Sequence, residues 1–194
     1  MSRERPAGHR LDGGRIADAL GVFAERLASA DVTAGVAGST MIALLGGDVE
    51  PADIDLTCHS GSLHVLRNLL GNPREMETGG PVWRNAWWLR GRVSGVPIDV
   101  IGGPAIQVDG HRVDLTPVSP LQIAVAKTRV SLADPGEWVY VYQAMGSDKA
   151  DLLAALLDPA DIAAAGTRLG ITPPYTGAPP RNSSPPARLN ETHV

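Results

Sequence analysis

The segment Ala52-Asp53-Ile54-Asp55-Leu56 decides the expected fold, because it sets two acids in an otherwise apolar strand. Successive side chains of a β-strand point to opposite faces, so Asp53 and Asp55 share one face while Ile54 and Leu56 share the other. Two neighbouring carboxylates repel and raise each other's pKa unless a cation lies between them. The pair alone fits a solvent-facing strand edge as well as it fits a Mg²⁺ site.

A third acid, Asp99, interrupts the apolar segment 96–101. Burying an acid without a partner costs free energy, so we expect Asp99 to lie beside Asp53 and Asp55 if the two strands are neighbours. Three carboxylates can bind two metal ions, an arrangement that serves phosphoryl and nucleotidyl transfer. The alternative is that Asp99 meets water at a strand end, and Asp114 is a weaker candidate for the third acid.

A Gly-Ser turn, Gly38-Ser39, follows the apolar segment 32–37 and precedes a helix expected over 40–45. Backbone N–H groups at the start of a helix favour a bound phosphate. The turn therefore predicts an anion site, although a serine that caps a helix after a glycine is common in proteins of every kind.

The remaining periodicity predicts one α/β (α+β) domain, a mixed β-sheet flanked by helices with further helices at its C-terminal side. Apolar residues at helical spacing predict a first helix from about residue 14. The predicted strands span 32–37, 53–58, 82–93 and 96–101, a hairpin follows over 106–115, and further helices begin at Ser119, Asp134 and Ser147. The domain covers 13–170, with a catalytic core at about 32–116 and a helical part at about 119–158. The segments 1–12 and 171–194 have little to bury, so we expect them to be disordered.

Composition sets further bounds. The chain has 194 residues, 43% of them hydrophobic, and a net charge of −4, which argues against affinity for nucleic acid over the whole surface but leaves a local basic cleft open. The lone cysteine, Cys58, excludes an internal disulfide. Without an apolar run of roughly 18 residues we expect no membrane span, and the polar segment 1–12 does not look like a signal peptide. We therefore expect a cytoplasmic protein.

Two sets of motifs resemble a known family. The turn Gly38-Ser39-Thr40, the Asp53-Ile54-Asp55 pair and the distant Asp99 resemble the nucleotidyltransferase superfamily of DNA polymerase β, in which these features follow one another in this order. The segment 121–127 and the segment 148–153 are similar to the Lys-containing helical motifs of AbiEii-type nucleotidyltransferases. Those proteins are toxin components of abortive-infection and related toxin–antitoxin systems.

The resemblance implies a site and a reaction. It implies that Asp53, Asp55 and Asp99 are the catalytic residues and bind Mg²⁺, with two ions expected and Mn²⁺ as an alternative. The nucleotide-binding residues that it implies are Gly38, Ser39, Thr40, Lys127 and Lys149. An acceptor hydroxyl would attack the α-phosphate of an NTP such as ATP in line, and pyrophosphate would leave.

The acceptor stays open. The AbiEii-like motifs imply a hydroxyl of RNA (tRNA included) or of a protein, a toxin role and an antitoxin partner. The alternatives are a small-molecule adenylyltransferase of the aminoglycoside or lincosamide type, and a non-catalytic nucleotide-binding domain. On the segment 82–93 one face carries Arg84, Trp88, Arg90 and Arg92, which would suit an acidic substrate, with Trp88 stacked on a base. An exposed polar face of a half-buried strand is the simpler interpretation.

Overall fold

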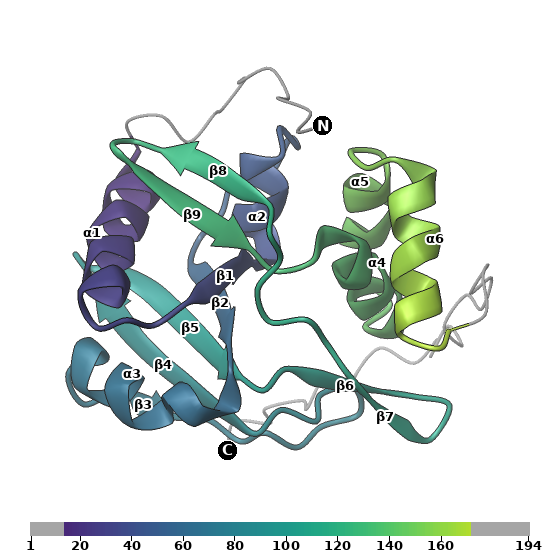
Figure 1. Ribbon diagram of the computed structural model, residues 1–194, viewed down its shortest axis with the longest axis horizontal. Helices are drawn as coiled ribbons and strands as arrows, with labels where there is room; N and C mark the ends of the chain where they lie inside the picture. The colour runs from purple at the N-terminus through teal and green to yellow at the C-terminus, as the bar shows by residue number, and fades with distance from the viewer. Residues whose placement is uncertain (1–13, 172–194) are drawn as a thin grey trace, which may run out of the picture.

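A mixed sheet organises residues 14–171, the part of the chain that the computed structural model describes (Figure 1). Its seven strands are β1 (Ala34–Ala37), β2 (Ile54–Cys58), β3 (Arg74–Glu75), β4 (Trp87–Val93), β5 (Val96–Gly102), β8 (Gln122–Val125) and β9 (Thr128–Leu132). They lie in the order β3-β4-β5-β2-β1-β9-β8. The pairs β2–β5 and β1–β9 are parallel and the others antiparallel, so the predicted mixed sheet is confirmed. A separate hairpin joins β6 (Ala105–Val108) to β7 (His111–Asp114).

The helices form two groups. They are α1 (Arg15–Ser29), α2 (Gly38–Leu44), α3 (Leu63–Leu70), α4 (Pro135–Ala144), α5 (Lys149–Ala154) and α6 (Pro159–Arg168), with a short 3₁₀ turn η1 (Ser60–Ser62) before α3. Both α1 and α3 contact β4, whereas α4 packs against α5 and α6, which gather on the other side of the view in Figure 1. Between residues 14 and 171, none of these helices has the length and apolar character that a membrane crossing requires.

One face of the sheet forms the core with α1. Leu20, Phe23 and Leu27 recur at helical spacing and are buried, as the periodicity of this segment predicts. They belong to the same apolar cluster as Ile54 and Leu56 of β2, both of which are almost fully buried. Burying side chains of this size stabilises the fold by roughly 1.5–3 kcal/mol each. Because side chains alternate along the segment 53–56, Asp53 and Asp55 point to the face of the sheet away from this core.

The helix predicted from Ser119 is wrong, because this segment forms the hairpin of β8 and β9. Ser119 does cap a turn, with its hydroxyl accepting a hydrogen bond from the N–H of Leu121 at 3.3 Å, but no helix follows. Instead β9 pairs in parallel with β1, with Val36 opposite Leu132, and so satisfies the backbone groups along that edge of β1. The local capping signal is weaker than this long-range pairing. The helical part therefore begins at Pro135.

Two of the C-terminal helices, α4 and α6, start at a capping aspartate. Asp134 caps α4 by accepting from the N–H of Glu137 at 3.1 Å, and Pro135 occupies the first turn, as predicted. The helix α6, capped by Asp158, was not predicted. Of the segments expected to be disordered, 1–12 and 172–194 lie outside the described residues. Ile171, at the start of the second, is buried in the core cluster.

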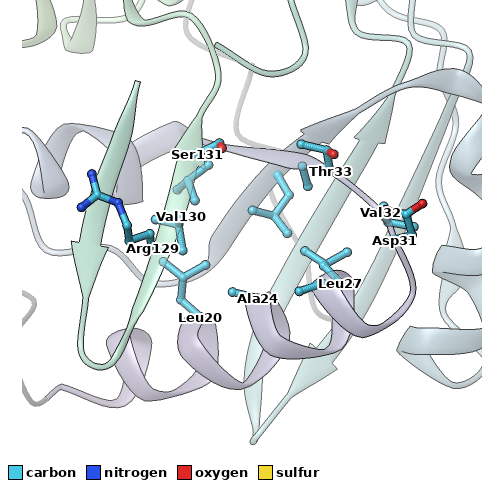
Figure 2. Close-up of a pocket in the computed structure, with 13 residues that line it drawn as sticks. Leu20, Ala24, Leu27, Asp31, Val32, Thr33, Arg129, Val130 and Ser131 are labelled. Carbon is cyan, nitrogen blue, oxygen red and sulfur yellow. The ribbon is translucent and has the colours of Figure 1, made fainter. Parts of the chain in front are cut away.

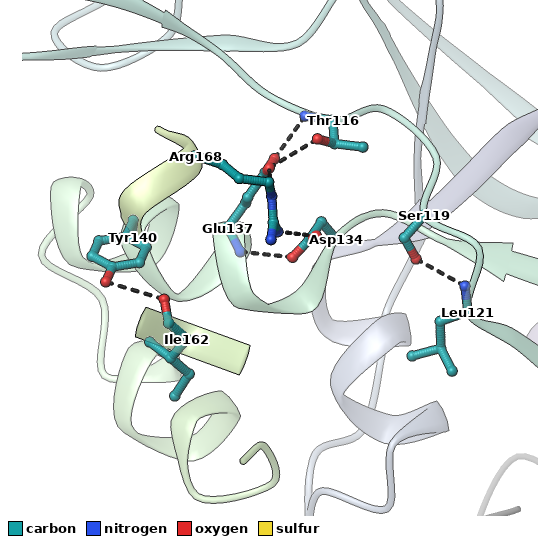
Figure 3. Close-up of polar contacts among 8 residues, drawn as sticks. All are labelled: Thr116, Ser119, Leu121, Asp134, Glu137, Tyr140, Ile162 and Arg168. Atoms are coloured by element: carbon teal, nitrogen blue, oxygen red, sulfur yellow. Dashed lines mark hydrogen bonds and ion pairs between the residues drawn. The ribbon is translucent and has the colours of Figure 1, made fainter. Parts of the chain in front are cut away.

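A buried carboxylate ties α4 to the segment before β8 (Figure 3). Glu137 is 2% exposed and accepts from the backbone N–H of Thr116 at 2.6 Å and from its hydroxyl at 2.8 Å. Arg168 of α6 lies beside this carboxylate and also pairs with Asp134. These contacts hold α4 and α6 to the segment that leads into β8. They bear on the site because it takes side chains both from the sheet and from the C-terminal helices.

Candidate functional site

The three predicted acids meet on the open face of the sheet. Asp55 of β2 lies directly opposite Asp99 of the parallel strand β5, and Asp53 precedes Asp55 by two positions on the same face. One carboxylate oxygen from each acid lies within 4.8 Å of the other two. The convergence expected from the sequence is therefore present, and its cause is the parallel register of two strands that are separated by more than 35 residues in the chain.

The acids are electrostatically strained without a cation. The pKa of Asp55 is raised to about 7, chiefly by burial and then by the charges of Asp53 and Asp99, against the opposing effect of Lys149 and Arg90. A divalent cation would remove the repulsion, and hard cations prefer oxygen ligands such as these. The residues present therefore fit a magnesium site.

The Gly38 turn lies against Asp55. Gly38 has a φ of +63°, and a Cβ at this position would lie 1.8 Å from Oδ2 of Asp55. A side chain here would therefore collide with the carboxylate as well as strain the backbone. Ala37, the residue before, is directly opposite Asp55 in the β1–β2 pair, so the start of α2 is held next to the acids by strand pairing.

Ser39 and Lys149 meet beside this turn. The Lys149 ammonium donates a hydrogen bond to Oγ of Ser39 at 2.7 Å and lies 6.0 Å from the ring centre of Tyr142. Lys149 starts α5, so this contact brings a positive charge from the helical group to the Gly-Ser turn. Two of the residues expected to bind nucleotide are thus in contact, although they stand 110 positions apart.

Thr40 lies at the site but faces inward. It is fully buried, and its hydroxyl donates to the backbone carbonyl of Asp53 at 2.8 Å. The contact braces the entry to β2 and so positions the Asp53 side chain. A hydroxyl that is already buried in this bond is poorly placed to bind a nucleotide.

Lys127 does not reach the acids. It stands in the exposed turn between β8 and β9, not on a helix as its motif implies. Because β9 runs parallel to β1 and Leu132 lies opposite Val36, Lys127 lies toward the end of β1 remote from Gly38. The expected helical placement of Lys127 is therefore wrong, and the nucleotide-binding role that the resemblance implies for it stays a prediction.

Arg90, which the sequence offered only as a possible contact for an acidic substrate, belongs to the site through Asp99. It lies directly opposite Asp99, and donates through Nε to Oδ1 at 2.7 Å and through a terminal nitrogen to Oδ2 at 2.6 Å. Hydrogen bonding and charge from Asp99 raise the pKa of Arg90. Counting outward from the turn at Ser94-Gly95 pairs Val93 with Val96 and so reaches this pair, which means that the hairpin register could have revealed it.

Tyr142 supplies a buried polar group nearby. Its side chain is 4% exposed, and its hydroxyl has no hydrogen-bond partner among the described residues. Burial raises the pKa of Tyr142, and the charge of Asp55 adds to this effect. The hydroxyl is therefore neutral, and it retains its hydrogen-bonding capacity beside the Lys149 ammonium.

A cavity of about 360 Å³ lies on the other face of the sheet, between α1 and strands β1 and β9. Figure 2 shows Leu20, Ala24 and Leu27 of α1 facing Val130 across it. Leu56 of β2 also lines it, and strand alternation points this side chain away from the acids. The cavity is therefore separate from the candidate site.

No family model and no curated protein matches the sequence. The structure is similar to a crystal structure from Thermotoga maritima, provisionally described as a nucleotidyltransferase, with a TM-score of 0.52 and 19% identity over 74% of this chain and 95% of that one. It is also similar to the solution structure of the antibiotic-resistance factor ANT(2'')-Ia, with a TM-score of 0.56 and 13% identity over 78% of this chain and 89% of that one. These similarities confirm the predicted nucleotidyltransferase fold.

Proposed function

We propose that this chain is a metal-dependent nucleotidyltransferase that moves NMP from an NTP to a hydroxyl of an acceptor. The observation that carries the proposal is the convergence of Asp53, Asp55 and Asp99 within 4.8 Å, directly beside the Gly38 turn. A non-catalytic domain would have no need of three carboxylates whose mutual repulsion destabilises the metal-free protein.

The three acids are the proposed ligands of the metal ions. Mg²⁺ is the proposed cofactor, with two ions and with Mn²⁺ as a substitute, and it would neutralise phosphate charge and polarise the α-phosphate when bound. Asp53 and Asp55 would hold the ions against the nucleotide. Asp99 would complete the ligand set and accept the proton of the attacking hydroxyl, while Arg90 holds its carboxylate in one orientation.

The Gly38-Ser39 turn and Lys149 of α5 are the proposed binding site of the triphosphate. Gly38 and Ser39 start α2, where backbone N–H groups without a helical partner would bind phosphate, and Lys149 adds a positive charge beside Ser39. The Lys149 ammonium would exchange its hydrogen bond with Ser39 for one with a phosphate oxygen. Pyrophosphate then leaves on the side of these groups as the acceptor oxygen attacks in line from the Asp99 side.

Two acceptor classes follow from different observations. The motif around Lys149 supports a hydroxyl of RNA, tRNA included, or of a protein, and with it a toxin role and an antitoxin partner. A cytoplasmic location is part of the same proposal. The structural similarity to an antibiotic-resistance factor supports a small-molecule acceptor instead. We favour RNA, because on the β4 side of Asp99 the neighbouring charge, that of Arg90, is positive.

A labelling assay tests the reaction and the acceptor together. The protein is incubated with each of the four α-³²P-labelled NTPs, Mg²⁺ and either total tRNA or a panel of aminoglycosides and lincosamides. We expect label on RNA in the wild type and none with Asp55→Asn. Label on a drug and not on RNA would favour the second class, and the absence of transfer to any acceptor, with no Mg²⁺-dependent NTP binding, would refute the proposal.

A further inference from the structure

We infer that the open face of β3 and β4 beside Asp99 binds a phosphate-bearing acceptor, the 3′ end of a single-stranded nucleic acid. This surface, the basic strip, consists of Arg74, Arg90 and Arg92, with Trp88 next to them. The inference rests on the proposed function, since it assigns the acceptor subsite of the same reaction.

Strand register places the basic strip in line with the acids. Arg74 of β3 lies opposite Arg90 of β4, Arg90 lies opposite Asp99, and Asp99 lies opposite Asp55. Directly paired residues point to the same face of a sheet, so one row of side chains runs from the acids to the β3 edge. Arg92 stands two positions from Arg90 and shares its face, level with the entry to β2.

The basic strip is not balanced by acids of its own. Arg74 and Arg92 are exposed, and neither forms an ion pair anywhere in residues 14–171. Only Arg90 is paired, and its side chain remains 47% exposed. Like charges directly opposite one another destabilise a sheet, and Asp99 offsets the charge of Arg90 but not that of Arg74. An anionic ligand would offset that remaining charge.

Trp88 adds a flat apolar surface to the same face. Its ring is partly exposed, and the Arg90 guanidinium carbon lies 5.8 Å from the ring centre. The indole N–H is buried and has no partner among the described residues. Aromatic rings next to arginines are the combination that binds single-stranded nucleic acid, because every base can stack and every linkage is charged.

The position of the basic strip separates it from the triphosphate. Ser39 and Lys149 lie on the β1 side of the acids, whereas the three arginines lie on the β5 side, next to Asp99. An acceptor hydroxyl that reaches Asp99 would therefore be attached to a molecule that crosses the arginines. A polycationic aminoglycoside would be repelled there, and a chain with a phosphate next to its terminal hydroxyl would be attracted.

The test is binding of a short fluorescent single-stranded oligoribonucleotide, followed by anisotropy at several salt concentrations without NTP. We expect Arg92→Ala and Arg74→Ala each to weaken binding by about tenfold, the usual effect of losing one charge-assisted contact. The logarithm of the association constant falls as the logarithm of the salt concentration rises, and each substitution should make this slope less steep by about 0.7. Arg26→Ala is the matched control, because it removes the same charge from an exposed position on α1, at the opposite face of the sheet.

Two further measurements make the result decisive. Kanamycin replaces the oligonucleotide in a calorimetric titration, and Mg²⁺-dependent binding of a fluorescent ATP analogue is measured in the same variants. The inference is overturned if Arg74→Ala and Arg92→Ala bind the oligonucleotide as Arg26→Ala does, or if kanamycin binds and the oligonucleotide does not. A wild type that fails to bind the ATP analogue would instead refute the proposed function, which is a separate result.

Discussion

The Lys149 ammonium donates a hydrogen bond to Oγ of Ser39 at 2.7 Å, and this single contact joins the C-terminal helices to the Gly-Ser turn. The acids come from the sheet and the ammonium from α5, so neither part alone contains the complete site. A second set of contacts, among Glu137, Thr116 and Arg168, joins α4 and α6 to the segment before β8.

Replacing Lys149 with methionine should impair the use of NTP. Lys149→Met keeps an unbranched side chain, one atom shorter, but removes the charge beside Ser39. A charge-assisted hydrogen bond contributes about 1.5–3 kcal/mol, so we expect the KM for NTP to rise about tenfold or more. Steady-state kinetics of NMP transfer provide the measurement. Lys127→Met is the comparison, because Lys127 lies in a remote hairpin turn and should have little effect. An equal loss in both variants would show that Lys127 acts as the motif implies.

A methyl group at Gly38 should abolish activity and lower stability. The Cβ of Gly38→Ala would overlap Oδ2 of Asp55, and the φ of +63° adds strain of roughly 1–2 kcal/mol for a residue with a side chain. Gly46→Ala separates the two effects, since Gly46 has a φ of +93° but open space around its Cβ position. We expect thermal unfolding to show a loss in both variants, and Mg²⁺ binding to be lost only in Gly38→Ala. Retention of Mg²⁺ binding in Gly38→Ala would contradict the tight contact with Asp55.

Without metal, stability should fall as the pH rises toward neutrality. The pKa of Asp55 in the folded protein is about 7, above its ordinary value of 3.8, so between these values the folded protein holds a proton that the unfolded chain has released. The free energy of unfolding therefore decreases with rising pH across this interval, and the decrease is complete above about pH 7.

Thermal melts in chelator at pH values from about 4 to about 8 measure this dependence. Asp55→Asn should remove most of the slope, and excess Mg²⁺ should restore stability at the upper end by binding the ionised acids. An identical slope in wild type and Asp55→Asn would assign the titration to another group.

Replacing Glu137 with glutamine should weaken the contact between α4 and the segment before β8 without altering the metal ligands. One oxygen of Glu137 accepts from the N–H of Thr116, and the other accepts from the Thr116 hydroxyl and from Arg168. In Glu137→Gln the amide nitrogen would therefore face either the N–H of Thr116 or the guanidinium of Arg168. The mismatch of two buried donors costs about 1–3 kcal/mol, which lowers the melting temperature by a few degrees or more.

Asp114→Asn is the matched acid-to-amide control, since its exposed ion pair with Arg112 contributes little. Differential scanning calorimetry compares the two variants, and calorimetric titration compares their Mg²⁺ binding. A melting temperature for Glu137→Gln equal to that of Asp114→Asn would show that the buried carboxylate does not hold the helices in place.

Local patterns were sufficient for much of the molecule. Alternation around Asp53 and Asp55 placed both acids on one face, helical spacing identified α1, and the cap at Asp134 marked the start of α4. These features are readable in the sequence because they depend on a residue and its neighbours within one or two turns or strands. The same is true of the Gly38-Ser39 turn, which local geometry marks as the start of a helix.

Only the tertiary structure decided the rest. The segment 119–132 carries a local helix signal, yet it forms strands because β1 needs a partner along its free edge, and this change moves Lys127 away from the acids. The contacts of Asp99 with Asp55 and Arg90 depend on strand register, and the contact of Lys149 with Ser39 joins residues 110 positions apart. The sequence by itself determined which residues have the chemistry for the site. Long-range pairing of strands and packing of helices decided which of them meet, because those energies depend on partners that no local pattern contains.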